Sequence, residues 1–187
     1  MRLFIAVNLT ERCRELLQNK VDEIKREVKE DVKWVKPQNW HLTLKFLGDV
    51  NKSKLSKIKE VIKNTGKGYS KFPVKFRGIG AFPELDYPRV FFIKIAKGED
   101  SLISINQNLE KKLEPLGFEP ENREYIPHLT VARSKDETNL KKFSRSLNKF
   151  NEKYFINVYM EVSVISLMES KLFPEGPVYE KISQISL

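Results

Sequence analysis

The two histidines of this chain stand in the same short pattern. His41 begins His-Leu-Thr-Leu and His128 begins His-Leu-Thr-Val, so a threonine, Thr43 or Thr130, follows each of them two places later. The 187 residues hold only five threonines, and two such matches by chance have odds on the order of one in a thousand. The repeated motif is therefore far more specific than a lone histidine.

Strand geometry would bring the members of each motif together. In an extended strand, residues i and i+2 project from the same face. Each motif would then present one imidazole and one hydroxyl on one face, while the intervening leucine, Leu42 or Leu129, packs in the opposite direction. Two such strands side by side would form a cleft that holds two imidazoles and two hydroxyls.

A pair of imidazoles suits the cleavage of a phosphodiester. The unperturbed pKa of imidazole lies near neutrality, so one ring can be neutral while the other is protonated. The neutral ring would remove a proton from the attacking water, and the protonated ring would donate one to the departing ribose oxygen. The threonine hydroxyls can donate hydrogen bonds to non-bridging phosphate oxygens, where charge redistributes in the transition state.

Three other interpretations compete with this acid and base pair. Each histidine alone suits an ordinary strand position, although the matched pair argues against that. Two histidines also suit zinc, but no HExxH, CxxC or acidic cluster lies nearby and threonine is a poor zinc ligand, so we expect neither metal nor cofactor. Arginines beside the single cysteine, Cys13, could activate it as a nucleophile, yet a buried helix thiol is favoured because the acid and base pair needs no covalent intermediate.

Length and charge narrow the class of protein. A chain of 187 residues fits one domain, or two small lobes that share one core. The net charge of +9 favours a polyanionic partner such as nucleic acid, although lysines spread along the chain are also typical of solvated helices. No apolar run approaches the roughly 20 residues of a membrane helix, and residues 1–7 resemble a strand more than a signal peptide. With a single cysteine, we expect a cytoplasmic protein.

The apolar pattern predicts an α+β fold with two similar halves. Strands are expected at residues 2–8, 40–47, 72–79, 90–96, 125–132, 153–170 and 179–185, with a short extended piece at 32–37. Helices are expected from a cap at Thr10 to about residue 29, and at 51–64, 100–115 and 137–150. Residues 80–88 suggest an irregular connection between two antiparallel strands. Because hairpin-compatible strands alternate irregularly with helices, mostly antiparallel sheets are favoured over a doubly wound parallel sheet.

The motifs and their flanks resemble the two-histidine phosphoesterase superfamily, specifically the bacterial and archaeal RNA 2',3'-cyclic phosphodiesterases, also called 2'-5' RNA ligases. The resemblance covers essentially the whole chain and is carried by Arg-Leu-Phe-Ile-Ala-Val from Arg2, Trp-His-Leu-Thr-Leu-Lys-Phe-Leu-Gly from Trp40, and Pro-His-Leu-Thr-Val-Ala-Arg from Pro127. It implies a bilobal fold in which two pseudo-symmetric lobes with outer helices enclose a central basic cleft. Residues 1–187 would form one such domain, and each lobe would contribute one His-x-Thr strand.

The resemblance also implies roles for individual residues. His41 would be the general acid that protonates the leaving 3' oxygen, and His128 the general base for water, which gives a 2'-phosphate end. Thr43 and Thr130 would hold the phosphate. The implied substrate is RNA with a 2',3'-cyclic phosphate end, without a cofactor, and in the reverse direction the same groups would join RNA ends by a 2'-5' linkage. We expect a monomer with a nucleotide in the cleft.

Two further residues, each five places after a histidine, are implied to contact the substrate. Phe46 would stack on the terminal base, and Arg133 would contact the phosphate or the nucleotide. In strict alternation from the histidines, both side chains fall on the opposite face of their strands. Core packing is therefore the alternative for Phe46 unless the strand bulges, whereas a guanidinium is less often buried and is well shaped for phosphate.

Two other functions remain open at the level of sequence. A module that binds RNA ends without turnover would share the charge and the cleft, but keeping both histidines and both threonines argues against it. A phosphodiesterase for small cyclic phosphate nucleotides would share the chemistry, but the net charge of +9 favours a longer polyanion.

Overall fold

The computed structural model describes residues 1–28, 32–135, 144–145, 147 and 156–187, and these form two antiparallel sheets. The first sheet has the order β3 (His41–Asp49), β1 (Arg2–Asn8), β8 (Val164–Phe173) and β9 (Gly176–Ser186). The second has the order β2 (Val32–Trp34), β6 (His128–Ser134), β5 (Tyr87–Lys97), β4 (Phe72–Glu84) and β7 (Val158–Val162). The predicted α+β fold with antiparallel sheets is confirmed.

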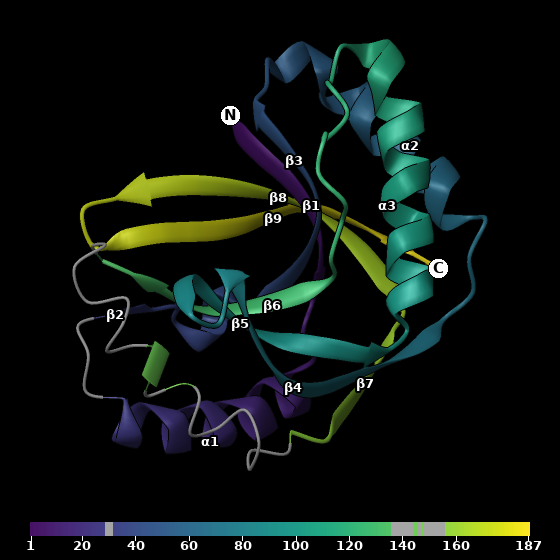
Figure 1. Cartoon of the computed structure of the whole chain (residues 1–187). Helices are drawn as coiled ribbons and strands as arrows, with labels where there is room; N and C mark the ends of the chain where they lie inside the picture. Colours follow the sequence, from purple (N-terminus) through teal and green to yellow (C-terminus); the bar gives the residue numbers. More distant parts are fainter. Residues whose placement is uncertain (29–31, 136–143, 146, 148–155) are drawn as a thin grey trace.

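Among the described residues, the helices α1 (Glu11–Glu27), α2 (Leu55–Gly66) and α3 (Glu99–Leu113) flank the sheets. Short 3-10 turns lie at Pro37–Asn39, Lys52–Lys54 and Glu114–Leu116. Figure 1 shows α2 and α3 together at one side of the molecule and α1 at the bottom. The cap predicted at Thr10 is confirmed, since its side chain accepts a hydrogen bond from the Cys13 amide.

Each half of the chain builds the same unit of strand, helix and His-x-Thr strand. In the first half β1 precedes α1 and pairs with β3, and in the second half β5 precedes α3 and pairs with β6. The helix of the second unit reaches the first, because Asn106 on α3 donates a hydrogen bond of 2.8 Å to the Leu44 carbonyl on β3. The two units are therefore packed against each other.

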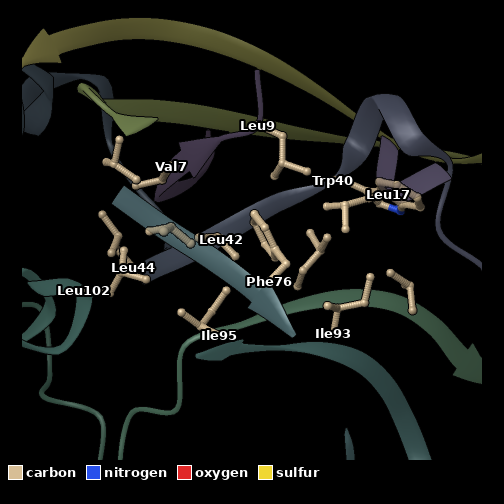
Figure 2. Close-up of a cluster of buried hydrophobic side chains, with 14 of the residues drawn as sticks. Val7, Leu9, Leu17, Trp40, Leu42, Leu44, Phe76, Ile93, Ile95 and Leu102 are labelled. Carbon is tan, nitrogen blue, oxygen red and sulfur yellow. The ribbon is translucent and has the colours of Figure 1, made fainter. Parts of the chain in front are cut away.

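A large apolar cluster lies between the two sheets. Figure 2 shows Val7 and Leu42 of the first sheet beside Phe76 and Ile95 of the second, with Leu102 of α3 at one side. All five side chains are buried. Burial of such side chains is worth about 1.5–3 kcal/mol each, so this shared core holds β3 and β6 in a defined relation.

Four sequence expectations need correction or lie outside the described residues. The irregular connection expected at 80–88 is wrong, because β4 runs on to Glu84 and β5 begins at Tyr87; shifts in their register accommodate the glycines and prolines. The strand expected from residue 125 begins only at His128, and the run at 153–170 is divided into β7 and β8. The helix expected at 137–150 lies outside the described residues apart from residues 144, 145 and 147, which are helical.

Candidate active site

The six side chains singled out in the sequence line one cavity where β3 meets β6, on the faces of these strands that point away from the apolar core. This cavity has a volume of ≈ 510 Å³, and its walls include His41, Thr43, Phe46, His128, Thr130 and Arg133. A second cavity of ≈ 1150 Å³ shares Thr43, Phe46, His128 and Arg133 with it. Strands far apart in the sequence thus bring both motifs to one place, with β3 against β6.

Matching β-bulges decide which way Phe46 and Arg133 point. In the pairing of β1 with β3, Ile5 lies opposite Lys45 and Ala6 opposite Thr43, which leaves Leu44 as an extra residue. An extra residue resets the alternation of faces along a strand. Accordingly Leu44 and Lys45 are both buried, and Phe46 is 67% exposed on the side of the histidine.

The second motif carries the same irregularity at the same place. In the pairing of β5 with β6, Phe92 lies opposite Thr130 and Phe91 opposite Ala132, so Val131 is the extra residue. Val131 and Ala132 are both buried, and the next residue, Arg133, is exposed and lines the cavity. Core packing of Phe46, the alternative that strict alternation favoured, is therefore wrong, and Arg133 faces the cavity for the same reason.

Both imidazoles are held by the same kind of hydrogen bond. The Nδ1 atom of His41 lies 2.7 Å from the Asn39 carbonyl oxygen, and that of His128 lies 2.7 Å from the Ile126 carbonyl oxygen. A carbonyl oxygen only accepts, so Nδ1 carries the hydrogen in each ring. Nε2 is then the atom of each neutral ring that can take up a proton.

Two side-chain hydrogen bonds tie the segments that carry the motifs to other parts of the chain. The Asn39 amide donates a hydrogen bond of 2.8 Å to the Pro177 carbonyl, which ties the turn before β3 to the β8–β9 hairpin. The Tyr125 hydroxyl donates one of 2.8 Å to the Thr43 carbonyl, which ties the segment before β6 to β3. Each motif is therefore fixed by contacts that come from outside its own strand.

Aromatic rings surround both histidines. The His41 ring lies with its centroid 4.8 Å from that of Phe4 and 5.1 Å from that of Tyr179. The His128 ring lies 5.0 Å from Phe92 and 4.9 Å from Phe82. Such neighbours exclude water and disfavour the charged form of an imidazole.

Desolvation accordingly lowers the pKa of both histidines. Burial lowers the pKa of His41 to about 4, opposed by its hydrogen bond to the Asn39 carbonyl and reinforced by the charges of His128 and Arg133. Burial also lowers the pKa of His128, opposed by the Ile126 carbonyl and reinforced by Arg133. In the free chain both rings are therefore neutral at pH 7, and an anion bound between them would favour protonation.

The structure adds residues to the cavity that sequence reasoning missed. They are Tyr179 from the last strand, Lys33 from β2, and Lys36 and Asn39 from the segment between β2 and β3. No local pattern marks them, since a tyrosine in a strand and lysines on an edge are common. Only the placement of the β8–β9 hairpin and of β2 beside the motifs brings them to the cavity.

The remaining candidates lie elsewhere. Cys13 is 1% exposed, and burial raises the pKa of its thiol to about 12, so it is a protonated helix thiol and not an activated nucleophile. Within the described part of the chain, no group of three His, Cys, Asp or Glu side chains is arranged to hold a metal ion. No helix among these residues is long and apolar enough to cross a membrane.

Comparison with known proteins places the chain among phosphoesterases. The family model described as LigT like Phosphoesterase matches residues 7–92 and again residues 93–179, one match in each half. An RNA 2',3'-cyclic phosphodiesterase of Methanothermobacter thermautotrophicus is 37% identical over 180 residues, 96% of this chain and 95% of the relative. The protein of the same name from Methanocaldococcus jannaschii is 35% identical over 98% of this chain and 99% of its own length.

Solved structures share the fold. A Thermus thermophilus protein superimposes with a TM-score of 0.80 at 27% identity, covering 100% of this chain and 98% of that one. E. coli LigT, crystallised with 3'-AMP, superimposes with a TM-score of 0.76 at 21% identity, covering 100% of this chain and 97% of that one. At that identity the second likeness bears on the fold alone.

Proposed function

Because this chain belongs to the LigT-like phosphoesterase family, we propose that it hydrolyses the 2',3'-cyclic phosphate ends of RNA, with His41 and His128 as the acid and base pair. It is a phosphoesterase, and its relatives of similar length are named RNA 2',3'-cyclic phosphodiesterases. The observation that carries the proposal is that both imidazoles line one cavity and engage Nδ1 with a carbonyl, which leaves Nε2 of each for proton transfer.

In the proposed reaction, one bond to phosphorus forms as another breaks. The oxygen of water attacks phosphorus while Nε2 of His128 takes the water proton. The bond between phosphorus and the 3' oxygen breaks, and His41 gives that oxygen a proton. The products are a 2'-phosphate and a 3' hydroxyl, and a ribose 5' hydroxyl in place of water would give a 2'-5' linkage.

The other cavity residues would stabilise the phosphate and the nucleotide. The hydroxyls of Thr43 and Thr130 donate hydrogen bonds to the non-bridging oxygens, and the Arg133 guanidinium balances the charge that grows on them. The exposed ring of Phe46 offers a flat face for a base. These contributions come from both sheets, so residues 1–187 would act as a single domain whose two lobes each supply one motif.

The pKa values of the free chain add a condition to this mechanism. The reaction needs one proton on the pair, and in the free chain that proton favours His128, because the pKa of His41 is lowered to about 4. The proposed roles place it on His41 in the reactive complex. A phosphate oxygen that accepts a hydrogen bond from Nε2 of His41 would raise the pKa of that ring and stabilise this state.

The proposed function is tested with an RNA oligonucleotide that ends in a 2',3'-cyclic phosphate, incubated with the protein in the presence of a chelator. A 2'-phosphate product is expected from the wild type. Substitution of either histidine by alanine should lower turnover by about 10³-fold, while circular dichroism shows an intact fold. Turnover at the wild-type rate in both variants would eliminate the proposal, and tight binding of the RNA by a wild type that forms no product would favour a module that only recognises RNA ends.

A substrate with sulfur in place of the 3' oxygen separates the two roles. A thiol has a pKa near 8.5, so sulfur leaves without help from a general acid. The His41→Ala variant should therefore regain most of its activity on this substrate, while His128→Ala should stay inactive because water still needs a base. Recovery of His128→Ala in place of His41→Ala would show that the two roles are reversed.

A further inference from the structure

We propose that Lys33 and Lys36 bind backbone phosphates of the RNA upstream of its cyclic end, and so make the enzyme favour polynucleotides over cyclic mononucleotides. This inference rests on the proposed function and adds to it the path of the substrate. Both lysines are exposed and line the cavity that holds the two histidines.

Two positively charged side chains lie opposite each other on neighbouring strands, and this arrangement favours the binding of an anion. In the pairing of β2 with β6, Lys33 lies directly opposite Arg133, so both side chains project from the same face. Like charges in such positions repel each other and destabilise a sheet. Among the described residues, none forms an ion pair with Lys33, Lys36 or Arg133. A bound polyanion would relieve this repulsion.

The backbone that carries the two lysines is held in place on both sides. Between them, the Val35 amide donates a hydrogen bond of 2.9 Å to the Val131 carbonyl on β6. The Trp40 indole donates one of 3.1 Å to the Val35 carbonyl. The lysines therefore extend from a fixed segment next to the second motif, which reduces the entropy lost when they bind.

Charge separates this cavity from the larger one. The smaller cavity is lined by three cationic side chains, Lys33, Lys36 and Arg133, and by one carboxylate, Glu175. The larger cavity is lined by five cationic side chains, Lys45, Arg89, Lys111, Arg123 and Arg133, but also by four carboxylates, Glu110, Glu114, Glu121 and Glu124, which nearly balance their charge. A chain of phosphates is favoured on the side with fewer carboxylates, which is that of the two lysines.

The test compares two substrates, a cyclic-ended RNA oligonucleotide and a 2',3'-cyclic mononucleotide. In the double variant Lys33→Ala/Lys36→Ala, the ratio of the KM values for oligonucleotide and mononucleotide should rise about tenfold. The dependence of the oligonucleotide KM on salt should also become shallower, because fewer counterions are released. An unchanged ratio would overturn the proposal, and so would an equal rise in both KM values.

A matched control variant removes two positive charges that lie outside both cavities. Lys57 and Lys63 are exposed on α2 and line neither cavity. Lys57→Ala/Lys63→Ala should leave the ratio of KM values unchanged. If this variant raised the ratio as much as the cavity variant, the effect would come from net charge and the proposal would be overturned.

A binding measurement distinguishes the two proposals. An oligonucleotide with a 2'-phosphate end, the expected product, is titrated into the wild type and the double variant. If the wild type turns over neither substrate, the proposed function fails, but a tenfold weaker Kd in the double variant would still support the lysines as a phosphate site. Equal Kd values in the two proteins would overturn that site.

Discussion

The two halves of the cleft have the same frame and differ in a few side chains. Each half supplies a histidine with Nδ1 bonded to a carbonyl, a threonine two places on, a bulge after it and two aromatic neighbours around the ring. They differ at the residue five places after the histidine, which is Phe46 in the first half and Arg133 in the second. They also differ in the depth of the pKa shift, since only that of His41 falls as low as about 4.

The shared features decide where the reactive groups lie, and the differing residues decide what each half contributes. The shared strand and bulge place the same chemical groups on both sides of a phosphate, which any symmetric pair of motifs would do. The exchange of a phenyl ring for a guanidinium gives one side an apolar platform and the other a positive charge. We therefore expect substitutions in the shared frame to affect both halves alike, and substitutions at the differing places to affect them unequally.

The largest expected effect concerns the shared histidines. His41→Ala and His128→Ala should each lower kcat on cyclic-ended RNA by about 10³-fold, because each removes one proton transfer. The double variant should be no slower than the slower single variant, since acid and base act as one unit. Single-turnover rates measure this, with circular dichroism as the check of folding. A double variant slower by the product of the two effects would mean that the rings act independently.

Substitutions at the two residues that lie five places after a histidine should lower activity by unequal amounts. Arg133→Ala should lower kcat/KM about 100-fold, because it removes a charged donor to phosphate. Phe46→Ala should lower it only about fivefold, by the loss of one stacking contact. Steady-state kinetics on the same RNA compare the two, and Arg133→Lys serves as the variant that keeps the charge but not the paired donors. Equal losses at the two places would contradict the asymmetry.

Stability should depend on pH more through His41 than through His128. A histidine in the unfolded chain takes up a proton near pH 6.5, whereas folded His41 does so only near pH 4. The contribution of neutral His41 to the free energy of unfolding is therefore fully present above pH 6.5 and is lost as the pH falls toward 4. Through His41, the free energy of unfolding should fall by about 2 kcal/mol over this range. This is less than the full shift of its pKa implies, because the ring lines the cavity and solvent there partly screens its charge. Urea unfolding at pH 7 and pH 4.5 measures it.

Variants identify the source of this pH dependence. His41→Gln should remove more of the acid destabilisation than His128→Gln, because burial shifts the pKa of His41 further. Carboxylates titrate in the same range, but they do so equally in both variants. A larger change in His128→Gln would mean that His128 is the more strongly desolvated ring of the two.

The smallest expected effect lies in the aromatic neighbours. Tyr179→Ala should raise the pKa of His41, since its ring contributes to the burial of the imidazole, and Phe82→Ala should do the same for His128. Tyr179→Phe keeps the ring and should change kcat/KM by less than about threefold. Nuclear magnetic resonance titration of the ring protons follows each histidine. A pKa of His41 that is unchanged in Tyr179→Ala would rule out this shielding role.

Local rules account for much of the fold and of the site. Alternation along a strand and the distance from His41 to Thr43 are properties of a few neighbouring residues, so the composition of the site and the antiparallel α+β fold followed from the chain alone. The same rules failed at residues 80–88, where glycine and proline suggested a loop. Pairing of β4 with β5 absorbed them by shifts in register, and a propensity cannot anticipate that pairing.

Tertiary structure decided what depends on partners from other parts of the chain. Whether Phe46 faces the core or the cleft depends on an extra residue in the pairing of β3 with β1, and a bulge is a property of two strands together. The pKa of His41 depends on Phe4 and Tyr179, which reach it from β1 and β9. A sequence specifies which groups are present and their local direction, but desolvation and register arise only when distant segments pack.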